Sequence, residues 1–420
     1  MRDMKDSGIE WIGKIPANKN IVRNKYYVSY TKGKNPISLN SEGFGKPYIG
    51  ASDLDTLNNT YENYTTDEYI PECTKDDILV LWDGARAGLL GTNKIGCISS
   101  TIVKLEVIPE VIYTHFFFWY LKGFEKFLSD MVTGTTIPHM NRRYIEDIQF
   151  IDFSLHQQQA IADYLDGECA RIDGIVTTQR QIIERLKEYK KSVITEAVTR
   201  GLNPDVPMKD SGIEWIGKIP QHWEIKKIKY LFQLRDERNY LPLEQVNLIS
   251  LYTDKGVLQH ADIEETTGNK AQNADGYKLV YEGDIIVNII LCWMGAIGFS
   301  AYNGVTSPAY DIYKPLPKTN SKYYHYLFRT SLFSGECYKV GRGIMLMRWR
   351  TYSDQFKSIY VSVPPIEEQQ EIADYLDGEC ARIDTIIEKR ERMIELMTEY
   401  KKSLIYECVT GKKEIVDVVE

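Results

Sequence analysis

Apolar residues recur at intervals of three and four along two long stretches of the chain, and this spacing predicts two long helices. The first extends from Gln157 to about Thr199, where Gly201 and Pro204 follow as residues that end helices. Each helix has a predicted length of ~65 Å at 1.5 Å per residue. The apolar positions are Ile161, Leu165, Ile172, Ile175, Ile182, Leu186, Tyr189 and Val193 in the first stretch, and Ile372, Leu376, Ile383, Ile386, Met393, Met397, Tyr400 and Leu404 in the second.

The two apolar stripes match, and a helix of this length cannot bury its stripe against a small domain. We therefore expect the helices to pack on each other as a coiled coil. Antiparallel pairing is favoured, because the second domain must lie between the end of helix one and the start of helix two. The expected result is a rod with one globular domain near each end, related by a pseudo-twofold axis, which would act as a fixed spacer.

The stretches outside the helices, about 17–153 and 221–363, combine strand-like and helix-like patterns. DILVLW and KLVYEGDIIVNII are typical of strands, whereas YTHFFFWYLKGF and YYHYLFRTSLF are typical of short helices. The aromatic run from Phe116 to Tyr120 is predicted to be core rather than a base-stacking platform. The apolar run from Ile285 to Phe299 is shorter than the roughly 20 residues that a membrane helix needs, so it predicts a buried strand pair.

The chain repeats itself. MKDSGIEWIGKIP occurs at Met4–Pro16 and again at Met208–Pro220, and IADYLDGECARID occurs at 161–173 and 372–384, with EYKKS following in both copies. We therefore predict an α+β protein of two mixed α/β domains joined by two long antiparallel coiled-coil helices. The expected segments are 1–156 (opening motif and first globular domain), 157–203 (central helix), 204–367 (second motif and second globular domain) and 368–420 (C-terminal helix and tail).

The net charge of −8 counts against nucleic-acid binding, since phosphate contacts need Lys and Arg. Acidic helix surfaces that face protein partners can nevertheless outweigh basic residues gathered in a few loops. The seven cysteines show no CxxC spacing, and the start of the chain has no apolar signal core. The composition therefore predicts a cytoplasmic protein with free thiols, no metal site and no membrane association.

Two Gly- and Arg-containing segments at corresponding places, VTGTTIPHMNRRY (132–144) and KVGRGIMLMRWRTY (339–352), are candidate DNA-facing loops. Their arginines suit phosphates or guanine edges, and His139 and Asn141 suit base edges. A glycine-rich turn with Arg86 in copy one and Trp293 in copy two is a second candidate. Ordinary surface salt bridges, or burial of Trp293, remain alternatives. The candidate DNA-binding residues are Arg86, His139, Asn141, Arg142, Arg143, Trp293, Arg342, Arg348 and Arg350.

The blocks SGIEWIGKIP, VPPIEEQQEIADYLD and ARID, with the duplicated architecture, resemble specificity subunits of type I restriction-modification enzymes over essentially the whole chain. The junction before the second helix has the family pattern at Pro364, Pro365, Glu367, Glu368 and Gln369. The first copy departs from it, with Phe153, Ser154, His156, Gln157 and Gln158 there, which predicts a weaker cap on helix one.

The resemblance implies that each domain reads half of a bipartite site on double-stranded DNA. It also implies two modification subunits that methylate adenine with S-adenosylmethionine, and restriction subunits that use ATP and Mg²⁺. No methyltransferase motif, phosphate loop or nuclease carboxylate cluster is found in this chain. We therefore expect a non-catalytic subunit that binds no cofactor itself. The alternatives are a sequence reader for a methyltransferase-only or other defence complex, and a coiled-coil scaffold that does not bind DNA.

Overall fold

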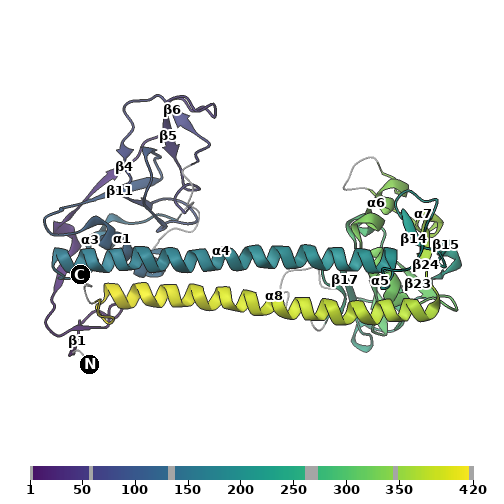
Figure 1. Ribbon diagram of the computed structural model, residues 1–420. Coiled ribbons are helices and arrows are strands. Elements are labelled where there is room, and N and C mark those ends of the chain that lie inside the picture. Colours follow the sequence, from purple (N-terminus) through teal and green to yellow (C-terminus); the bar gives the residue numbers. More distant parts are fainter. Residues whose placement is uncertain (1–2, 56–59, 131–137, 261–272, 344–348, 416–420) are drawn as a thin grey trace. The chain divides into compact units, whose positions relative to one another are not determined.

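The computed structural model describes residues 3–55, 60–130, 138–260, 273–343 and 349–415, except the side chains of Arg142 and Tyr144. The chain divides into two compact units. Unit 1 comprises Met1–Arg180 and Glu391–Glu420, and unit 2 comprises Gln181–Arg390. Each unit therefore contains one globular domain and a part of both long helices (Figure 1).

The two predicted long helices are confirmed as α4 (Leu155–Arg200) and α8 (Ile366–Val409). In unit 1 the beginning of α4 shares a hydrophobic core with the end of α8, through residues such as Ile161 and Leu404. In unit 2 the end of α4 shares a core with the beginning of α8, through Val198 and Ile372. The beginning of one helix thus meets the end of the other in each unit, as antiparallel pairing requires.

The repeated sequence blocks contact each other across this helix pair. Lys401 Nζ lies 2.6 Å from Asp173 Oδ2 in unit 1, and Lys190 Nζ lies 2.7 Å from Asp384 Oδ2 in unit 2. Each pair joins the lysine of an EYKKS block to the aspartate of an ARID block on the other helix. Because partly exposed ion pairs contribute only about 0–1 kcal/mol, we assign these pairs to the register of the helices rather than to their stability.

Two positions of the predicted apolar stripe are wrong. Tyr189 and Tyr400 are 49% and 46% exposed, whereas Ile183 and Ile387, which the predicted stripe omits, are buried. A straight α-helix drifts by about 20° per heptad relative to a strict 3.5-residue repeat. The buried stripe therefore rotates away from positions chosen by regular spacing.

The predicted weak cap on the first long helix is also wrong. The Ser154 hydroxyl accepts a hydrogen bond from the Gln157 backbone N–H, and the Gln157 side chain accepts one from the Ser154 backbone N–H, both at 3.3 Å. This reciprocal pair is a capping box, which satisfies two N–H groups that have no partner inside the helix. Helix α4 thus begins with a side-chain cap of its own, built from Ser154 and Gln157.

The globular domains share one sheet topology. The order β4-β11-β8-β9 in unit 1 corresponds to β16-β23-β20-β21 in unit 2, and all neighbours in both sheets are antiparallel. These strands are β4 (Val28–Lys32), β8 (Ile78–Leu81), β9 (Leu90–Gly91), β11 (Ile102–Val107), β16 (Phe232–Arg235), β20 (Ile285–Asn288), β21 (Ile297–Phe299) and β23 (Tyr310–Pro315). The pairing of β20 with β21 confirms the predicted buried strand pair at 285–299.

Smaller sheets complete the two domains. In unit 1 they comprise β3 (Ile21–Arg23) with β12 (Gln149–Ile151), and the sheet of β5 (Lys46–Ile49), β6 (Tyr64–Thr65), β7 (Glu72–Cys73) and β10 (Gly96–Ile98). In unit 2 they comprise β15 (Glu224–Lys227) with β24 (Tyr360–Val363), β17 (Ile249–Tyr252) with β18 (Gly256–Gln259), and β19 (Lys278–Val280) with β22 (Gly304–Thr306).

Short helices connect each sheet to the long helices. They are α1 (Thr114–Gly123), α2 (Glu125–Asp130) and α3 (Arg142–Glu146) in unit 1, and α5 (Ser321–Phe328), α6 (Ser331–Val340) and α7 (Ser353–Ser358) in unit 2. The aromatic run of α1 is core, as predicted, because Phe116, Phe117 and Tyr120 are fully buried.

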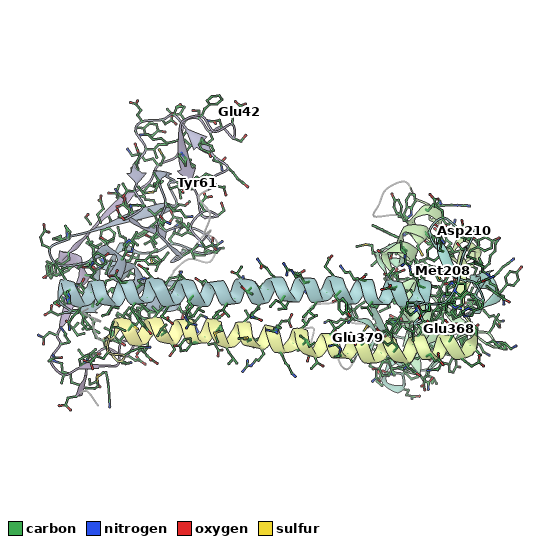
Figure 2. The ribbon with its side chains drawn as sticks, in the orientation of Figure 1. Glu42, Tyr61, Met208, Asp210, Glu368 and Glu379 are labelled. Carbon is green, nitrogen blue, oxygen red and sulfur yellow. The ribbon has the colours of Figure 1, made fainter. Side chains whose placement is uncertain are left out.

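The repeated 13-residue opening motif forms a hairpin in both units, β1 (Met4–Asp6) with β2 (Lys14–Pro16) and β13 (Met208–Asp210) with β14 (Lys218–Pro220). In unit 1 it packs against the end of α8, where the Tyr406 hydroxyl donates a hydrogen bond to the Ile12 carbonyl at 2.8 Å. In unit 2, Glu368 in the first turn of α8 accepts hydrogen bonds from Trp223 and His222, which follow the motif. Figure 2 labels Glu368 together with Met208 and Asp210 of the motif.

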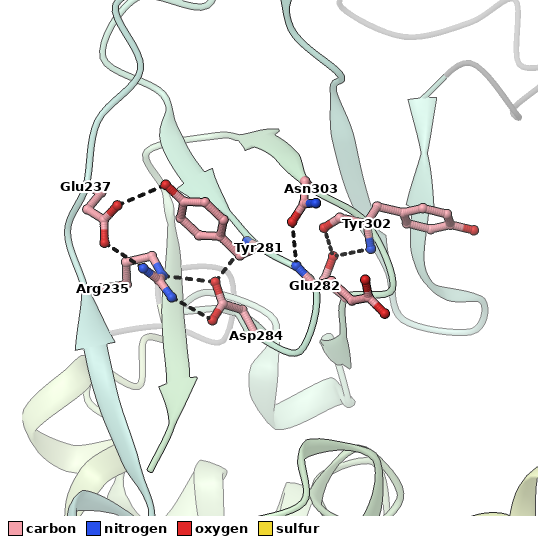
Figure 3. Close-up of polar contacts among 8 residues, drawn as sticks. Arg235, Glu237, Tyr281, Glu282, Asp284, Tyr302 and Asn303 are labelled. Atoms are coloured by element: carbon pink, nitrogen blue, oxygen red, sulfur yellow. Dashed lines mark hydrogen bonds and ion pairs between the residues drawn. The ribbon is translucent and has the colours of Figure 1, made fainter. Parts of the chain in front are cut away.

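A buried ion pair secures the main sheet of unit 2 (Figure 3). Arg235 on β16 donates to both oxygens of Asp284, at 3.0 and 3.2 Å, and its guanidinium lies 4.4 Å from the Tyr281 ring centre. Asp284 also accepts from the Tyr281 backbone N–H at 2.9 Å. Its counterpart Asp77 in unit 1 accepts from the Thr74 N–H at 2.7 Å, so both copies use this aspartate to close the turn before a central strand.

No helix in the described part of the chain is both long enough and apolar enough to cross a membrane. All seven cysteines are buried free thiols.

Candidate nucleic-acid interface

The two segments that the sequence singled out separately in unit 1 are hydrogen-bonded to each other. The Met140 N–H donates to the Trp82 carbonyl at 2.8 Å, and the Gly84 N–H donates to the Pro138 carbonyl at 2.9 Å. Between them, the His139 ring Nδ1 lies 2.7 Å from Asp83 Oδ1. The glycine-rich turn and the following loop therefore form one surface.

Unit 2 makes the corresponding connection. The Thr351 N–H donates to the Ile289 carbonyl at 2.9 Å, at the positions that match Met140 and Trp82 in the repeat. The Thr351 hydroxyl donates to the Cys337 carbonyl at 2.9 Å and ties the loop to the end of α6. Arg342 and Arg350 exchange backbone hydrogen bonds of 2.8 and 2.9 Å, which bring both ends of the loop together.

The candidate residues of unit 1 have different environments. Arg86 is half exposed and pairs with Asp55 at 2.6 Å. The Asn141 side chain caps α3 by accepting from the Arg143 N–H at 3.0 Å, so its oxygen already has a structural role. Arg143 is exposed on α3. The side chain of Arg142 lies outside the described residues.

Burial alone would raise the pKa of Asp83. Hydrogen bonds from His139 and Lys32 have the larger, opposite effect and hold that pKa below its ordinary value of 3.8. Lys32 Nζ lies 3.0 Å from Asp83 Oδ2. The carboxylate thus stays ionised and fixes the Lys32 ammonium group, which has further N–H donors for DNA, and the His139 ring, whose Nε2 remains to make a hydrogen bond. No sequence pattern indicated Lys32 or Asp83, because Lys32 lies on β4, which is distant in sequence from Asp83 and His139.

In unit 2, Trp293 is half-buried beside the Tyr338 ring, with the ring centres 5.7 Å apart. Its indole nitrogen is buried and has no hydrogen-bond partner among the described residues. Trp293 and Tyr338 line a hollow of about 730 Å³ beside α4. The Tyr338 ring also stacks on Trp349, at 4.9 Å and 24°, a contact that the sequence did not suggest.

The structure describes two of the three arginines of the second loop. Arg342 is exposed and Arg350 is half-buried, whereas Arg348 lies outside the described residues. The structure thus joins the turn of Arg86 with the loop of His139 in one unit, and the turn of Trp293 with the loop of Arg342 and Arg350 in the other. No group of three or more His, Cys, Asp and Glu that suits a metal ion occurs in the parts that are described.

Comparison with known proteins agrees with the duplicated architecture. The model of the type I restriction modification DNA specificity domain matches residues 16–188 and again 220–396. The chain is 26% identical to the specificity subunit of the type I restriction enzyme MjaVIII from Methanocaldococcus jannaschii, over 95% of this chain and 94% of that protein. It is 23% identical to the EcoDI specificity subunit from Escherichia coli, over 76% and 74% of the two chains.

Solved structures show the same fold. The HsdS subunit from Thermoanaerobacter tengcongensis superposes with a TM-score of 0.54 at 12% identity, over 95% of this chain and 98% of that one. A chain from a study of complex assembly and conformational transition in the type I R-M system gives a TM-score of 0.69 at 11% identity, over 95% and 99%.

The chain belongs to the type I restriction-modification DNA specificity family. This membership confirms the predicted class of function, a non-catalytic subunit that confers DNA sequence specificity.

Proposed function

We propose that this chain reads a two-part site on double-stranded DNA, one half with each unit, and positions two modification subunits and the restriction subunits on it. One observation carries the proposal. The framework contacts are the same in both units, as in Asp173–Lys401 and Lys190–Asp384, whereas the candidate interface carries Arg86 and His139 in one unit and Trp293 and Arg342 in the other. A common framework that carries different DNA-contacting residues in each unit suits the recognition of two different half-sites.

The contact residues that we propose are Arg86, His139, Asn141, Arg142, Arg143, Trp293, Arg342, Arg348 and Arg350. Arginine and lysine can donate two hydrogen bonds to guanine, and asparagine can donate one to adenine and accept one from it. The Asn141 oxygen caps α3, so its amide nitrogen remains to donate a single hydrogen bond to an acceptor on a base edge.

The repeated helix surface supports two copies of one partner. Tyr189 and Tyr375 in unit 2 are 49% and 44% exposed, and they correspond to Tyr400 and Tyr164 in unit 1. Exposed tyrosines are enriched in protein interfaces. Identical surfaces should bind identical subunits. Native mass spectrometry of the assembled complex tests this, because Tyr189→Ala and Tyr400→Ala should each remove one modification subunit, whereas exposed Lys187→Ala should remove none.

The reactions belong to the partners in this proposal. S-adenosylmethionine binds to the modification subunits, ATP and Mg²⁺ bind to the restriction subunits, and this chain binds none of them. We place the complex in the cytoplasm, and the buried free thiols fit a reducing compartment.

Sequencing of methylated DNA tests the function directly. The chain would be co-expressed with its modification subunit, and every methylated site would be aligned. Two constant half-sites at a fixed separation are expected. Methylation without a bipartite motif would contradict the proposal, and a chain without DNA affinity in the complex would favour the scaffold alternative.

A further inference from the structure

A basic cluster lies in unit 2 where the 3-10 helix η2 (Ile228–Tyr230) meets α7. Lys227, Lys229 and Lys357 line a hollow of about 290 Å³, which they share with Asp354 and Ser358. Among the described residues, none of these lysines forms an ion pair within 4.0 Å. Instead, Lys227 Nζ lies 4.9 Å from the Tyr360 ring centre, and Lys229 Nζ lies 4.8 Å from that of Tyr230.

Unit 1 contains the corresponding cluster where η1 (Asn24–Tyr26) meets α3. Arg23 and Lys25 occupy the places of Lys227 and Lys229, and Arg143 supplies a third cation one turn away from the place of Lys357. Lys25 Nζ lies 4.8 Å from the Tyr26 ring centre, as in the lysine–tyrosine pair of unit 2. Both tyrosines are largely exposed, at 64% for Tyr26 and 62% for Tyr230.

Backbone contacts hold both clusters in place. The Ile228 N–H donates to the Ile359 carbonyl at 3.0 Å, and the Asn24 N–H donates to the Ile148 carbonyl at 2.9 Å. The buried Asn24 side chain also donates to the Ile145 carbonyl at 2.8 Å. Each cluster is therefore fixed to a short helix that directly follows a loop of the candidate interface, α3 after Asn141 and α7 after Thr351.

The charge pattern indicates a polyanion as the partner. The long helices carry cations that are paired on the same helix, such as Arg171 with Glu168 and Arg382 with Glu379. Three cations gathered without such partners repel one another, and a bound polyanion would remove this repulsion. Phosphate oxygens accept hydrogen bonds from lysine, arginine and tyrosine, which are the side chains present here.

Because the clusters occur in both units, the DNA backbone suits them better as a binding partner than the bases do. A feature that reads bases should differ between the units, as the candidate loops do, whereas a feature that contacts phosphates carries no sequence information and can be the same. We propose that the two basic–aromatic clusters bind backbone phosphates of double-stranded DNA beside each half-site. The proposal rests on the DNA-reading function proposed above and adds residues to it.

The test uses the assembled complex with target and random duplexes at several salt concentrations. Lys227→Gln with Lys229→Gln, and separately Arg23→Gln with Lys25→Gln, should weaken binding to both duplexes by the same factor. The slope of log affinity against log salt should become shallower by about 0.9 for each phosphate that the variant no longer neutralises. The methylated motif should stay the same.

Lys226→Gln provides a matched control. Lys226 precedes Lys227 on β15 but is paired with Glu224, so its replacement should leave affinity and salt slope unchanged. Thermal unfolding of each variant should match the wild type, since the substituted side chains lie at the surface.

Wild-type affinity and slope in both double variants would overturn the proposal. Loss of partner subunits with unaltered DNA binding would also overturn it and would assign the clusters to a protein interface. Failure of the wild-type complex to prefer target over random DNA would instead count against the proposed function, so the two failures are distinguishable.

Discussion

The buried side chain of Gln158 accepts a hydrogen bond from the Tyr113 backbone N–H at 2.8 Å and thereby connects the first turn of α4 to the start of α1. Its amide also donates to the carbonyls of Phe153 and Val111. In unit 2, Gln369 accepts from the Asn320 N–H at 2.9 Å and donates to Pro364 and Lys318. The two glutamines are equivalent in the repeat, and each orients a globular domain on its long helix.

Replacing either glutamine with methionine should therefore destabilise its unit. Gln158→Met and Gln369→Met leave one N–H and two carbonyls without their partner, at a cost of about 1–3 kcal/mol for an unsatisfied buried group. Urea unfolding measures the loss. The exposed helix residue Gln181, changed to methionine, should lose far less, and equal stability of all three variants would contradict the role of the buried amide.

Removing Arg235 alone should destabilise the protein more than removing the charges of both Arg235 and Asp284. Arg235→Met leaves a carboxylate that is 2% exposed without its charge partner, which typically costs about 3–5 kcal/mol of unfolding free energy. Adding Asp284→Asn should recover part of that loss, since the amide oxygen can still accept from Tyr281. As a control, Arg238→Met removes a pair with exposed Asp236 and a hydrogen bond to the Gly276 carbonyl, and it should cost clearly less than Arg235→Met.

Unit 2 should lose stability in acid because of His325. Burial, helped by the nearby Arg329 charge, lowers its pKa from 6.5 to about 3, and its ring accepts a hydrogen bond from the Phe299 N–H. The unfolded chain therefore takes up this proton before the folded chain does. The contribution of the neutral ring is complete above about pH 6.5 and decreases as the pH falls toward 3.

Urea midpoints across this pH range check that expectation. His325→Gln keeps an acceptor but does not titrate, so its stability should fall less between pH 6.5 and 4 than that of the wild type. If the urea midpoints of the wild type and His325→Gln fell equally with pH, the low pKa of His325 would not be the cause of the acid instability.

Arg342→Ala and Arg350→Ala should weaken binding of the target by the assembled complex and relax recognition of one half-site only. Removing a pair of hydrogen bonds to a base typically costs about 1–3 kcal/mol. The same outcome is expected for Arg348→Ala, in the segment outside the described residues. Binding assays and methylated-site sequencing measure both effects, with Arg382→Ala on α8 as the control. Unaltered affinity for target and random DNA would exclude this loop as a contact surface.

The long helices should set the separation of the half-sites. Because α4 and α8 pair antiparallel, a heptad inserted after Thr177 needs a matching one after Glu388 to keep the apolar stripes in register. At 1.5 Å per residue this adds ~10 Å, or about three base pairs at roughly 3.4 Å each.

Methylation of a library of spacer lengths would show the shift, although altered rotation about the DNA axis would reduce affinity. Insertion of two residues breaks the stripe and should prevent assembly. An active heptad variant that prefers the original spacer would contradict a measuring role for the helices.

The sequence predicted the parts of this fold that depend on periodicity and repetition. The long helices, the buried strands at 285–299 and the aromatic core of α1 follow from patterns within one segment. Tyr189 and Tyr400 lie off the predicted stripe because the actual helical period differs from a regular spacing of three and four residues. The capping box of Ser154 and Gln157 is not part of the family pattern at this junction, so the resemblance does not predict it.

The candidate interface was less predictable because it is assembled from distant segments. Lys32, Asp83 and His139 meet only after three separate stretches of chain come together. The basic clusters were hidden for a related reason. The total charge of −8 averages over the whole chain, while the lysines of η2 and α7 gather only in the folded protein.

The contact between the end of α8 and the opening motif has a consequence for gene architecture. Gly411 lies against Pro16 in unit 1 as Gly201 lies against Pro220 in unit 2. Helix α4 leads from unit 1 to unit 2, and α8 leads back to unit 1. A reading frame that joined Gly411 to the first motif and opened the chain before Met208 would therefore encode the same two units in the reverse order.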